Sequence, residues 1–545
     1  MQLDLSSATH GNSRRLAWFA LVVAGLLPRL NGIDQPLPTI EAWVANSATA
    51  HSWKQVFYYH DWLQTSPPLF LVAVRGMAGL FHLSNWSLRL APLLFGLAAM
   101  VLVALLSARA FPAPFALCCA SLAAFSPLAI TYSREVKQYT GDAASTALLL
   151  LLLWRYRERP DSSAYWRVVA ACFITLLLSY TATMILPLML LVMAATEPHL
   201  VPGQNRRRVK FLRCGWLMLL ASVESAAIYL VFIRPNVSPR LYTFWRDLGG
   251  YLTTRNPVEL ALFYARYFLG MPLYTLLPHD IDLLSAYAAI LRVPRILLLL
   301  LLVVIVVVLA HLVAKCRNDS RRLWLAIFAG VPVLTLAAFN MAGLYPVGSR
   351  KMVLFLLPCT AIGITLLLEA LVGSQPSAPA WTAAISLALA TAFAGGWEGH
   401  RVVLEEDAEG PLGYVQKTAA PGDLFYVHAS IAEPVKLYFR MFHWSAPGGG
   451  VTFGDTGYSC CTRKPDPSDA SAMNQEMSSL LARSPGRQVW LLFTGRPEPW
   501  PKLHRELAVE RFASAQCGQH SAPAFSGARL LEFTCPAGPL SADSR

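Results

Sequence analysis

The feature that most constrains this chain is a series of long apolar segments separated by short polar ones. The clearest covers residues 296–312 and contains no Lys, Arg, Asp or Glu. About 20 apolar residues are needed for a helix to cross the hydrocarbon core of a bilayer. Unbroken apolar runs exclude a transmembrane barrel, whose strands alternate between apolar and polar residues. We therefore predict an α-helical polytopic membrane protein.

Composition supports this prediction, because 14% of the 545 residues are charged whereas about 25% are charged in soluble domains. The first apolar segment follows Arg14 and Arg15 and lacks a small-residue cleavage site, so we interpret it as a span rather than a signal peptide. About eleven spans are expected, at residues 16–33, 89–108, 113–131, 141–155, 166–181, 182–198, 212–233, 293–313, 323–342, 352–372 and 380–397.

Basic residues in the short loops predict the orientation of these spans. Under this count one side receives Arg14, Arg15, Arg109, Arg155, Arg157, Arg159, Arg206, Arg207, Arg208, Lys210, Arg213, Lys315, Arg317, Arg321 and Arg322. That side is expected to be the cytoplasm. Because much of the net charge of +13 lies in these loops, where it sets membrane orientation, it is a poor argument for a nucleic-acid partner. Residues 66–86 are interpreted as an interfacial or re-entrant helix, because a further span there would invert every later loop.

The character of the sequence changes after residue 397. Residues 398–545 alternate apolar and polar stretches, with strands expected at 424–427, 489–493 and 530–533 and helices at 411–418 and 433–442. We therefore divide the chain into a transmembrane domain, 1–397, and a small α/β extramembrane domain, 398–545, outside the cytoplasm. Disulfides are expected there among Cys460, Cys461, Cys517 and Cys535, whose pairing the sequence does not fix.

Acidic and basic residues gather in three loops predicted on the non-cytoplasmic side. The candidates are Asp34, Glu41, His60 and Asp61 in the first loop, Arg134, Glu135, Lys137, Tyr139 and Asp142 around the second, and Arg350 and Lys351 in the last. Ionisable groups at a membrane face cost free energy unless they are paired or used. Basic residues on the face that normally lacks them favour an anionic ligand, and a lipid phosphate is the obvious one.

This mixture of side chains suits the transfer of a sugar from a lipid phosphate. One carboxylate can take the proton of an acceptor hydroxyl as the hydroxyl attacks the anomeric carbon. Cationic groups can stabilise the charge that grows on the departing phosphate. A second carboxylate can orient the sugar, a cationic partner or a divalent metal.

Five short motifs in this order resemble a known family. They are Glu41-Ala42-Trp43, His60 to Pro67-Pro68-Leu69, Arg89-Leu90-Ala91-Pro92, Ser133 to Tyr139, and Tyr345-Pro346 with Arg350. Together they resemble the bacterial branch of the glycosyltransferase-C superfamily, of the protein-mannosyltransferase and aminoarabinose-transferase type (glycosyltransferase family 39-like), over most of residues 16–397. The resemblance implies an enzyme that moves a sugar from a polyprenyl-phosphate carrier to a hydroxyl at the periplasmic face, with inversion.

The resemblance also implies roles for individual residues. Such enzymes carry Asp-Glu in the first loop, with the Asp as base, whereas this chain has Ile40-Glu41. The base is then Glu41, or Asp34 or Asp61 in its place.

Lys137 and Arg350 match positions near the carrier phosphate, and we group Arg134 and Lys351 with them. Glu135 and Asp142 match a second acidic cluster that contacts donor or metal. We assign Tyr139 and His60 to the same orienting group.

Two other functions stay open at this point. A non-catalytic partner of such an enzyme would explain Ile40, and a lipid or glycan transporter would share the polytopic architecture. No cofactor is required by the sequence, and a divalent metal is left open. The expected partners are a polyprenyl-phosphate sugar, a lipid or glycan acceptor and membrane lipids. The excess of Arg over Lys suggests a bacterial inner membrane.

Overall fold

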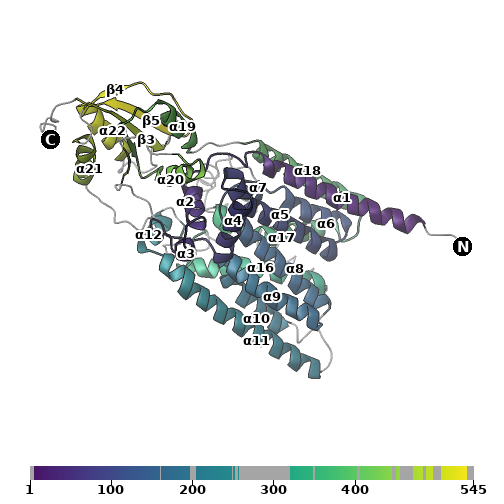
Figure 1. The fold of residues 1–545 in the computed structure, drawn as a ribbon. Helices are drawn as coiled ribbons and strands as arrows, with labels where there is room; N and C mark the ends of the chain where they lie inside the picture. Colours follow the sequence, from purple (N-terminus) through teal and green to yellow (C-terminus); the bar gives the residue numbers. More distant parts are fainter. Residues whose placement is uncertain are drawn as a thin grey trace.

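The computed structural model describes residues 5–159, 161–196, 204–247, 250–251, 256, 319–347, 350–401, 406–444, 450–454, 470–482, 486–494 and 505–536. The predicted span at 293–313, Cys460 and Cys461 lie outside these residues. A bundle of long helices runs up to His400, and a smaller part built around a sheet follows at one end of the bundle (Figure 1).

The helical part has two kinds of element. The long helices are α1 (Leu5–Leu30), α5 (Asn85–Ala110), α8 (Tyr139–Glu158), α9 (Ser162–Leu178), α10 (Tyr180–Thr196), α11 (Gln204–Ile228), α16 (Ser320–Met341), α17 (Leu357–Val372) and α18 (Ala378–His400). The short ones are α2 (Thr39–Ala48), α3 (Trp53–Phe57), α4 (Pro68–Leu80), α6 (Ala113–Ala124), α7 (Pro127–Ser133), η2 (Tyr229–Ile233), η3 (Arg234–Asn236), α12 (Pro239–Asp247) and η4 (Arg350–Leu356).

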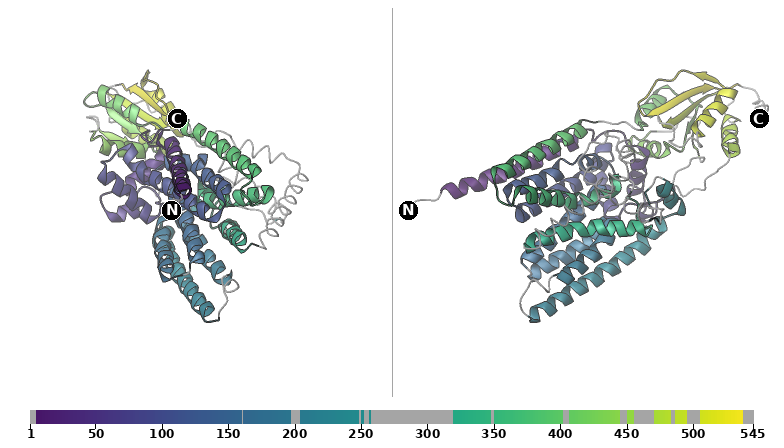
Figure 2. Two further views of the ribbon diagram at one scale, coloured as in Figure 1. Left: turned by 90° about the vertical axis from the view of Figure 1, so that its right-hand side faces the viewer. Right: turned by 180° about the vertical axis from the view of Figure 1, so that it is seen from behind.

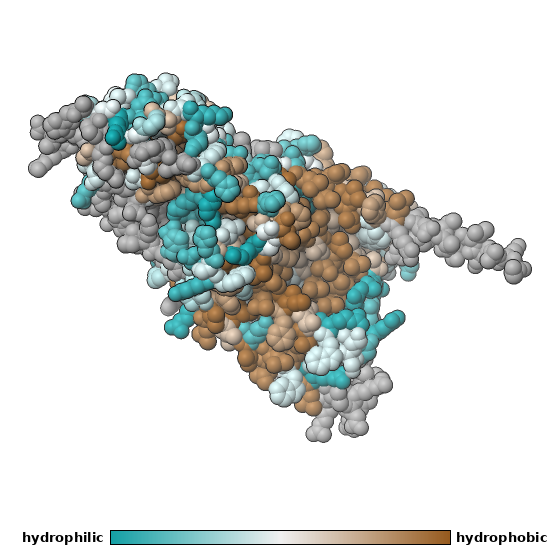
Figure 3. Space-filling model, viewed as in Figure 1, coloured by the Kyte–Doolittle hydropathy of each residue, from teal (hydrophilic) through white to brown (hydrophobic). Residues whose placement is uncertain are grey.

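Among the described residues, five helices are long and apolar enough to cross a membrane. They are Asn85–Ala110, Leu212–Asn236, Ser320–Met341, Arg350–Val372 and Ala378–His400. The pair α6–α7 would add a sixth, and four shorter apolar helices are Leu16–Leu30, Pro68–Leu80, Ser162–Leu178 and Tyr180–Ala194. Apolar side chains cover much of the bundle surface (Figure 3). The chain is a multi-pass membrane protein, and the count of about eleven spans stays a prediction.

The segment predicted as one span at 113–131 is two helices that meet at an angle of 43°. The break has a local cause. Pro127 cannot donate a backbone hydrogen bond, and the Ser126 side chain accepts from Ala129 N at the start of α7. This bend carries the chain toward the second candidate loop, which begins directly after Ser133.

Helices α1 and α18 lie side by side along one edge of the bundle (Figures 1 and 2). Two glycines of α18 allow close approach, Gly399 to α1 and Gly395 to the break between α6 and α7. A Cβ at Gly399 would lie 2.4 Å from Pro28 Cβ, and one at Gly395 would lie 2.5 Å from the Phe125 carbonyl oxygen. Their ends therefore reach the segment around Asn31 and the end of α7.

Helix α4 occupies the stretch interpreted above as interfacial or re-entrant. Its 13 residues extend about 20 Å at 1.5 Å per residue, which is shorter than the hydrocarbon core of about 30 Å. One face packs through Phe70, Leu71 and Val74 on the apolar cluster that also contains Val44 of α2. Helices α2, α3 and α4 thus form a layer at the end of the bundle nearest the sheet (Figure 1).

The smaller part contains a five-stranded sheet in the order β2-β1-β3-β5-β4. The strands are β1 (Leu424–Val427), β2 (Val451–Phe453), β3 (Gln488–Thr494), β4 (Gly518–His520) and β5 (Ala528–Thr534), and the helices are α19 (Glu409–Thr418), α20 (Ala432–Met441), α21 (Ala470–Ala482) and α22 (Arg505–Gln516). β1 runs parallel to β2 and β3, and β5 is antiparallel to β3 and β4.

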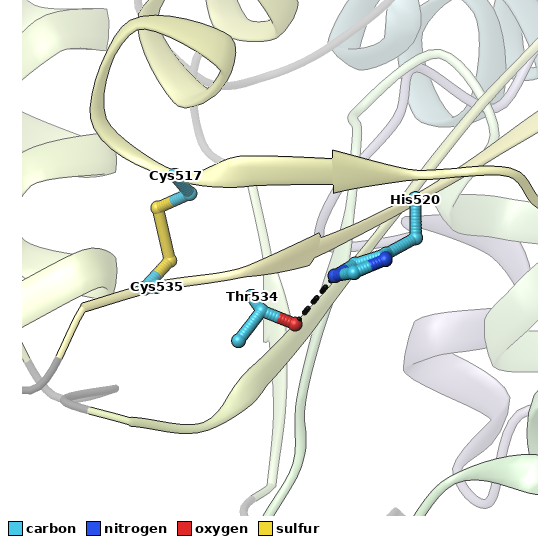
Figure 4. The surroundings of a disulfide bond; sticks show 4 residues. All are labelled: Cys517, His520, Thr534 and Cys535. Carbon is cyan, nitrogen blue, oxygen red and sulfur yellow. Dashed lines mark hydrogen bonds between the residues drawn. A yellow bond between two sulfur atoms is a disulfide. The ribbon is translucent and has the colours of Figure 1, made fainter.

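Each face of the sheet has its own apolar core. One involves α19 and α20, through residues such as Leu412 and Val435, and the other involves α21 and α22, through Leu480 and Val509. A disulfide between Cys517 and Cys535 joins the end of α22 to the end of β5, next to the His520–Thr534 contact (Figure 4). Helix α18 continues to His400, so the boundary at 397/398 stays a prediction.

Candidate functional site

Glu41 lies in the first turn of α2, where a negative charge interacts favourably with the helix dipole. Its side chain is buried and accepts three hydrogen bonds. Arg89 donates through Nε to Oε2 and through Nη2 to Oε1, each at 3.1 Å. The backbone nitrogen of Val136 donates to Oε2 at 2.8 Å. Both oxygens of Glu41 are therefore engaged, in an arrangement that joins the first loop to α5 and to the second loop.

Arg89 strengthens this junction from the other side. It also donates to the carbonyl oxygens of Ile33, Gln35 and Pro36, at the end of the segment that leads into α2. The guanidinium is only 3% exposed. The planar guanidinium has five N–H donors and can therefore bind one carboxylate and several carbonyl oxygens at once. These hydrogen bonds fix the path of the first loop.

Asp61 is held by a different set of groups. Its Oδ2 lies 2.7 Å from Lys436 Nζ and 3.1 Å from His60 Nε2. Lys436 belongs to α20 and also pairs with Glu433 Oε1 at 2.8 Å. Burial lowers the pKa of Lys436, but the nearby charges of Glu433 and Asp61 outweigh it and raise the pKa overall. Asp61 and His60 thus lie where the first loop meets the sheet-containing part.

Glu433 is the centre of that contact. Its side chain is 1% exposed, and its Oε2 accepts from Asn46 Nδ2 at 2.7 Å and from Tyr59 OH at 3.0 Å. Burial, followed by the charge of Glu433, raises the pKa of Tyr59. Two further bonds, Thr39 Oγ1 to Ser430 O at 2.6 Å and Leu37 N to Tyr438 OH at 2.7 Å, complete the contact. The sheet-containing part therefore holds the same helix that carries Glu41.

Lys137 lies in the second loop, between α7 and α8. Its Nζ lies 4.4 Å from the centre of the Trp43 ring, a cation–π contact that fixes the ammonium group over α2. Burial and the positive charge of Lys351 lower the pKa of Lys137 to about 7. Lys351 itself, in η4, lies over the Trp245 ring at 5.8 Å. The ammonium groups of Lys137 and Lys351 come from distant segments of the chain, yet the charge of Lys351 lowers the pKa of Lys137.

Glu135 lies in the second loop with Lys137 and is partly exposed. Within the described ranges, no side chain or backbone group forms a hydrogen bond or ion pair with its carboxylate. Burial and the charge of Glu41 raise the pKa of Glu135, against the opposing effect of Lys351, Lys137 and Arg89. A carboxylate and two ammonium groups therefore meet here beside the Glu41–Arg89 pair.

Arg134 has a different position from its neighbours. It donates to the carbonyl oxygens of Asn31, Glu398, Gly399 and Arg401. These carbonyls lie where α18 ends and where the chain leaves α1, and the last turn of a helix lacks a full set of helical partners for its carbonyls. Arg134 therefore closes both helix ends. Arg350 begins η4, and its charge acts on Tyr132.

Tyr139 and Asp142 lie at the start of α8. Tyr139 packs edge-on against Tyr132, with ring centroids 5.1 Å apart. Asp142 is 6% exposed and interacts with the hydroxyls of Ser179 and Thr181. Its Oδ1 has no hydrogen-bond partner. This acid lies deeper in the bundle than Glu135.

The structure thus brings together some of the sequence candidates and separates others. Glu41, Glu135, Lys137 and Lys351 share one electrostatic cluster, whereas His60 and Asp61 belong to the contact with α20. Sequence reasoning had noted Arg89 only within a motif and had missed Glu433 and Lys436, since ion pairs between distant segments leave no local pattern. Among the described residues, no group of three or more His, Cys, Asp or Glu side chains is placed to hold a metal ion.

Comparisons with known proteins agree with the resemblance seen in the motifs. The family model described as dolichyl-phosphate-mannose-protein mannosyltransferase matches residues 65–228. The crystal structure of ArnT from Cupriavidus metallidurans in the apo state has a TM-score of 0.53 at 12% identity, covering 98% of this chain and 100% of that chain. ArnT bound to undecaprenyl phosphate gives 0.53 at 13% identity, with coverage of 97% and 99%. No curated protein matches the sequence.

Proposed function

Because the chain carries a family segment and a fold of the glycosyltransferase-C superfamily, we propose that it is a membrane glycosyltransferase with a polyprenyl-phosphate sugar as donor. The sugar passes to a hydroxyl of a lipid or glycan acceptor, at the periplasmic face of a bacterial inner membrane, with inversion at the anomeric carbon. The sheet-containing part lies on the same periplasmic side, next to the first loop.

One observation carries this proposal: the ammonium groups of Lys137 and Lys351 repel each other, and both act on the Glu135 carboxylate. Like charges repel more strongly where water is excluded, and this repulsion contributes to the lowered pKa of Lys137. The charge of Glu41 is offset by Arg89, whereas Lys137 and Lys351 repel each other. A phosphate monoanion or diester would relieve that repulsion, and undecaprenyl phosphate is the ligand in one ArnT structure of the same fold.

The chemistry follows from this placement. The carrier phosphate lies against Lys137 and Lys351, so that the cations stabilise the negative charge that develops as the sugar departs. The acceptor hydroxyl enters from the side of α2 and attacks the anomeric carbon opposite the phosphate, which inverts that centre. The Glu41–Arg89 pair holds the first and second loops together so that donor and acceptor meet in a fixed geometry.

Binding of undecaprenyl phosphate to the purified protein in nanodiscs tests the donor site. Lys137→Met and Lys351→Met together should weaken the affinity at least tenfold, because both cationic partners of the phosphate are removed. The matched control is Lys417→Met at an exposed position of α19, which should bind like the wild type. Equal affinity in the double variant and the control would overturn the assignment of this site.

A non-catalytic partner protein is the second candidate, and Ile40 favours it. This side chain is 41% exposed at the position where the family resemblance expects the acidic base. Turnover decides between the two candidates. Transfer from an undecaprenyl-phosphate sugar to any hydroxyl acceptor supports the enzyme, whereas folded protein that binds the carrier with no turnover supports the partner protein.

A further inference from the structure

The loss of an acid at position 40 raises the question of which carboxylate can accept a proton. A general base needs a free lone pair directed at the hydroxyl. Both oxygens of Glu41 accept hydrogen bonds, from Arg89 and from the Val136 backbone. Asp61 forms ion pairs with Lys436 and His60 through Oδ2, and Asp34 is exposed and acts on Glu409 of α19. Glu41 would have to give up hydrogen bonds to act as the base. Neither Asp34 nor Asp61 is among the groups that act most strongly on Glu135 or Lys137.

Glu135 differs from these acids in its contacts and exposure. Its carboxylate forms no hydrogen bond or ion pair with any part of the chain that the structure describes. It is partly exposed, whereas Glu41 is 3% exposed. Its neighbour Val136 donates its backbone N–H to Glu41, which anchors the second loop on α2. Glu135 is thus a free carboxylate on a fixed piece of backbone.

The charges around Glu135 suit a base that works beside a phosphate. Glu41 faces it from α2, Arg89 from α5 and Lys351 from η4, and Lys137 follows it in the loop. Its charge also acts on Arg134, Tyr132 and Tyr139. Burial and Glu41 raise the pKa of Glu135, which favours uptake of a proton, while Lys137 and Lys351 oppose that rise.

We infer that Glu135, rather than an acid of the first loop, is the catalytic base of the proposed transfer. The hydroxyl oxygen of the acceptor forms a bond to the anomeric carbon as its proton passes to a Glu135 oxygen. The bond from the anomeric carbon to the phosphate oxygen breaks, and its electron pair stays with the phosphate between Lys137 and Lys351. The products are the glycoside and the carrier phosphate, and protonated Glu135 then returns its proton to water. This inference rests on the proposed function.

Asp142 is the rival that also has a free oxygen, Oδ1. It is 6% exposed at the start of α8 and interacts with the hydroxyls of Ser179 and Thr181. Within the described part of the chain, no cation is among the groups that act on it, whereas Lys137 and Lys351 act on Glu135. It serves as the comparison variant below.

Turnover of the full chain in nanodiscs, with an undecaprenyl-phosphate sugar as donor, tests the inference. Glu135→Gln should lower kcat by about 10²-fold or more, as loss of a general base does, and leave the affinity for undecaprenyl phosphate within about threefold. Glu135→Asp should recover part of the lost rate. Glu532→Gln in β5 is the matched control and should turn over like the wild type.

Chemical rescue separates a base from a residue that only shapes the loop. In Glu135→Gly, added formate or azide should raise kcat at least tenfold, because a small anion can take the proton where the carboxylate stood. Asp142→Gly should show no such gain. Rescue of Asp142→Gly alone, or wild-type kcat in Glu135→Gln, would overturn the assignment to Glu135 while the transferase proposal stands. An inactive wild type would overturn both.

Discussion

The buried Glu41–Arg89 pair provides the sharpest test of how the candidate site is held together. We consider Arg89→Met, which keeps an apolar stem of similar length and removes the cation. It deletes two bonds to Glu41 and three to the carbonyls of Ile33, Gln35 and Pro36. Glu41 then keeps only its bond from Val136 N.

The expected cost follows from the burial of both partners. Their side chains are 3% and 4% exposed, so the orphaned carboxylate cannot regain water. Breaking a buried ion pair at one end costs about 3–5 kcal/mol, and we expect a loss of that size. Glu41→Gln alone should also destabilise, because the Arg89 charge is then left without its counter-charge.

The double variant is the decisive member of the series. In the Arg89→Met background, Glu41→Gln removes the unpaired negative charge. It should therefore lower the free energy of unfolding much less in that background than in the wild type. The coupling energy should be about 1–3 kcal/mol. Unfolding in mixed micelles with increasing SDS, followed by circular dichroism, gives the free energies, and Lys417→Met serves as a control. Additive effects, with a coupling below about 0.5 kcal/mol, would refute the role of this pair.

Three further predictions concern the donor site and the smaller part. Burial lowers the pKa of Lys137 to about 7, so Lys137 is charged below that pH and neutral above it. Affinity for undecaprenyl phosphate should fall from pH 6 to pH 9 in the wild type and stay flatter in Lys137→Arg. Glu433→Ala removes the carboxylate that accepts hydrogen bonds from Tyr59 and Asn46, and thermal unfolding should show a loss of about 1–3 kcal/mol. The Cys517–Cys535 disulfide spans 18 residues, so replacing both by Ser should destabilise the sheet by about 3 kcal/mol, measured as faster tryptic cleavage after Arg529 in β5.

The sequence predicted the helices well because apolar length and local breakers determine them. The strands expected at 424–427, 489–493 and 530–533 lie within β1, β3 and β5. The bend at 125–126 was missed, although Ser126-Pro127 is a local signal for it. The resemblance to the glycosyltransferase-C superfamily is confirmed by the family match and the shared fold.

The roles of the acids could not be read in the same way, because they depend on partners far away in the chain. Arg89 lies 48 residues from Glu41, and Lys436 lies 375 residues from Asp61. From the sequence, Glu41, Asp34 and Asp61 were the candidate bases, and Glu135 was assigned to the group that orients donor or metal. Only tertiary contacts distinguish a carboxylate that is already paired from one that is free.

The central claim is that the second loop and η4 bind the carrier phosphate. A structure of the full chain in nanodiscs with an undecaprenyl-phosphate sugar bound measures this directly. We predict the phosphate within about 3 Å of Nζ of both Lys137 and Lys351, with the Glu135 carboxylate facing the anomeric carbon from the other side. A phosphate at the opposite end of the bundle, near Arg322 and Glu369, would contradict the account.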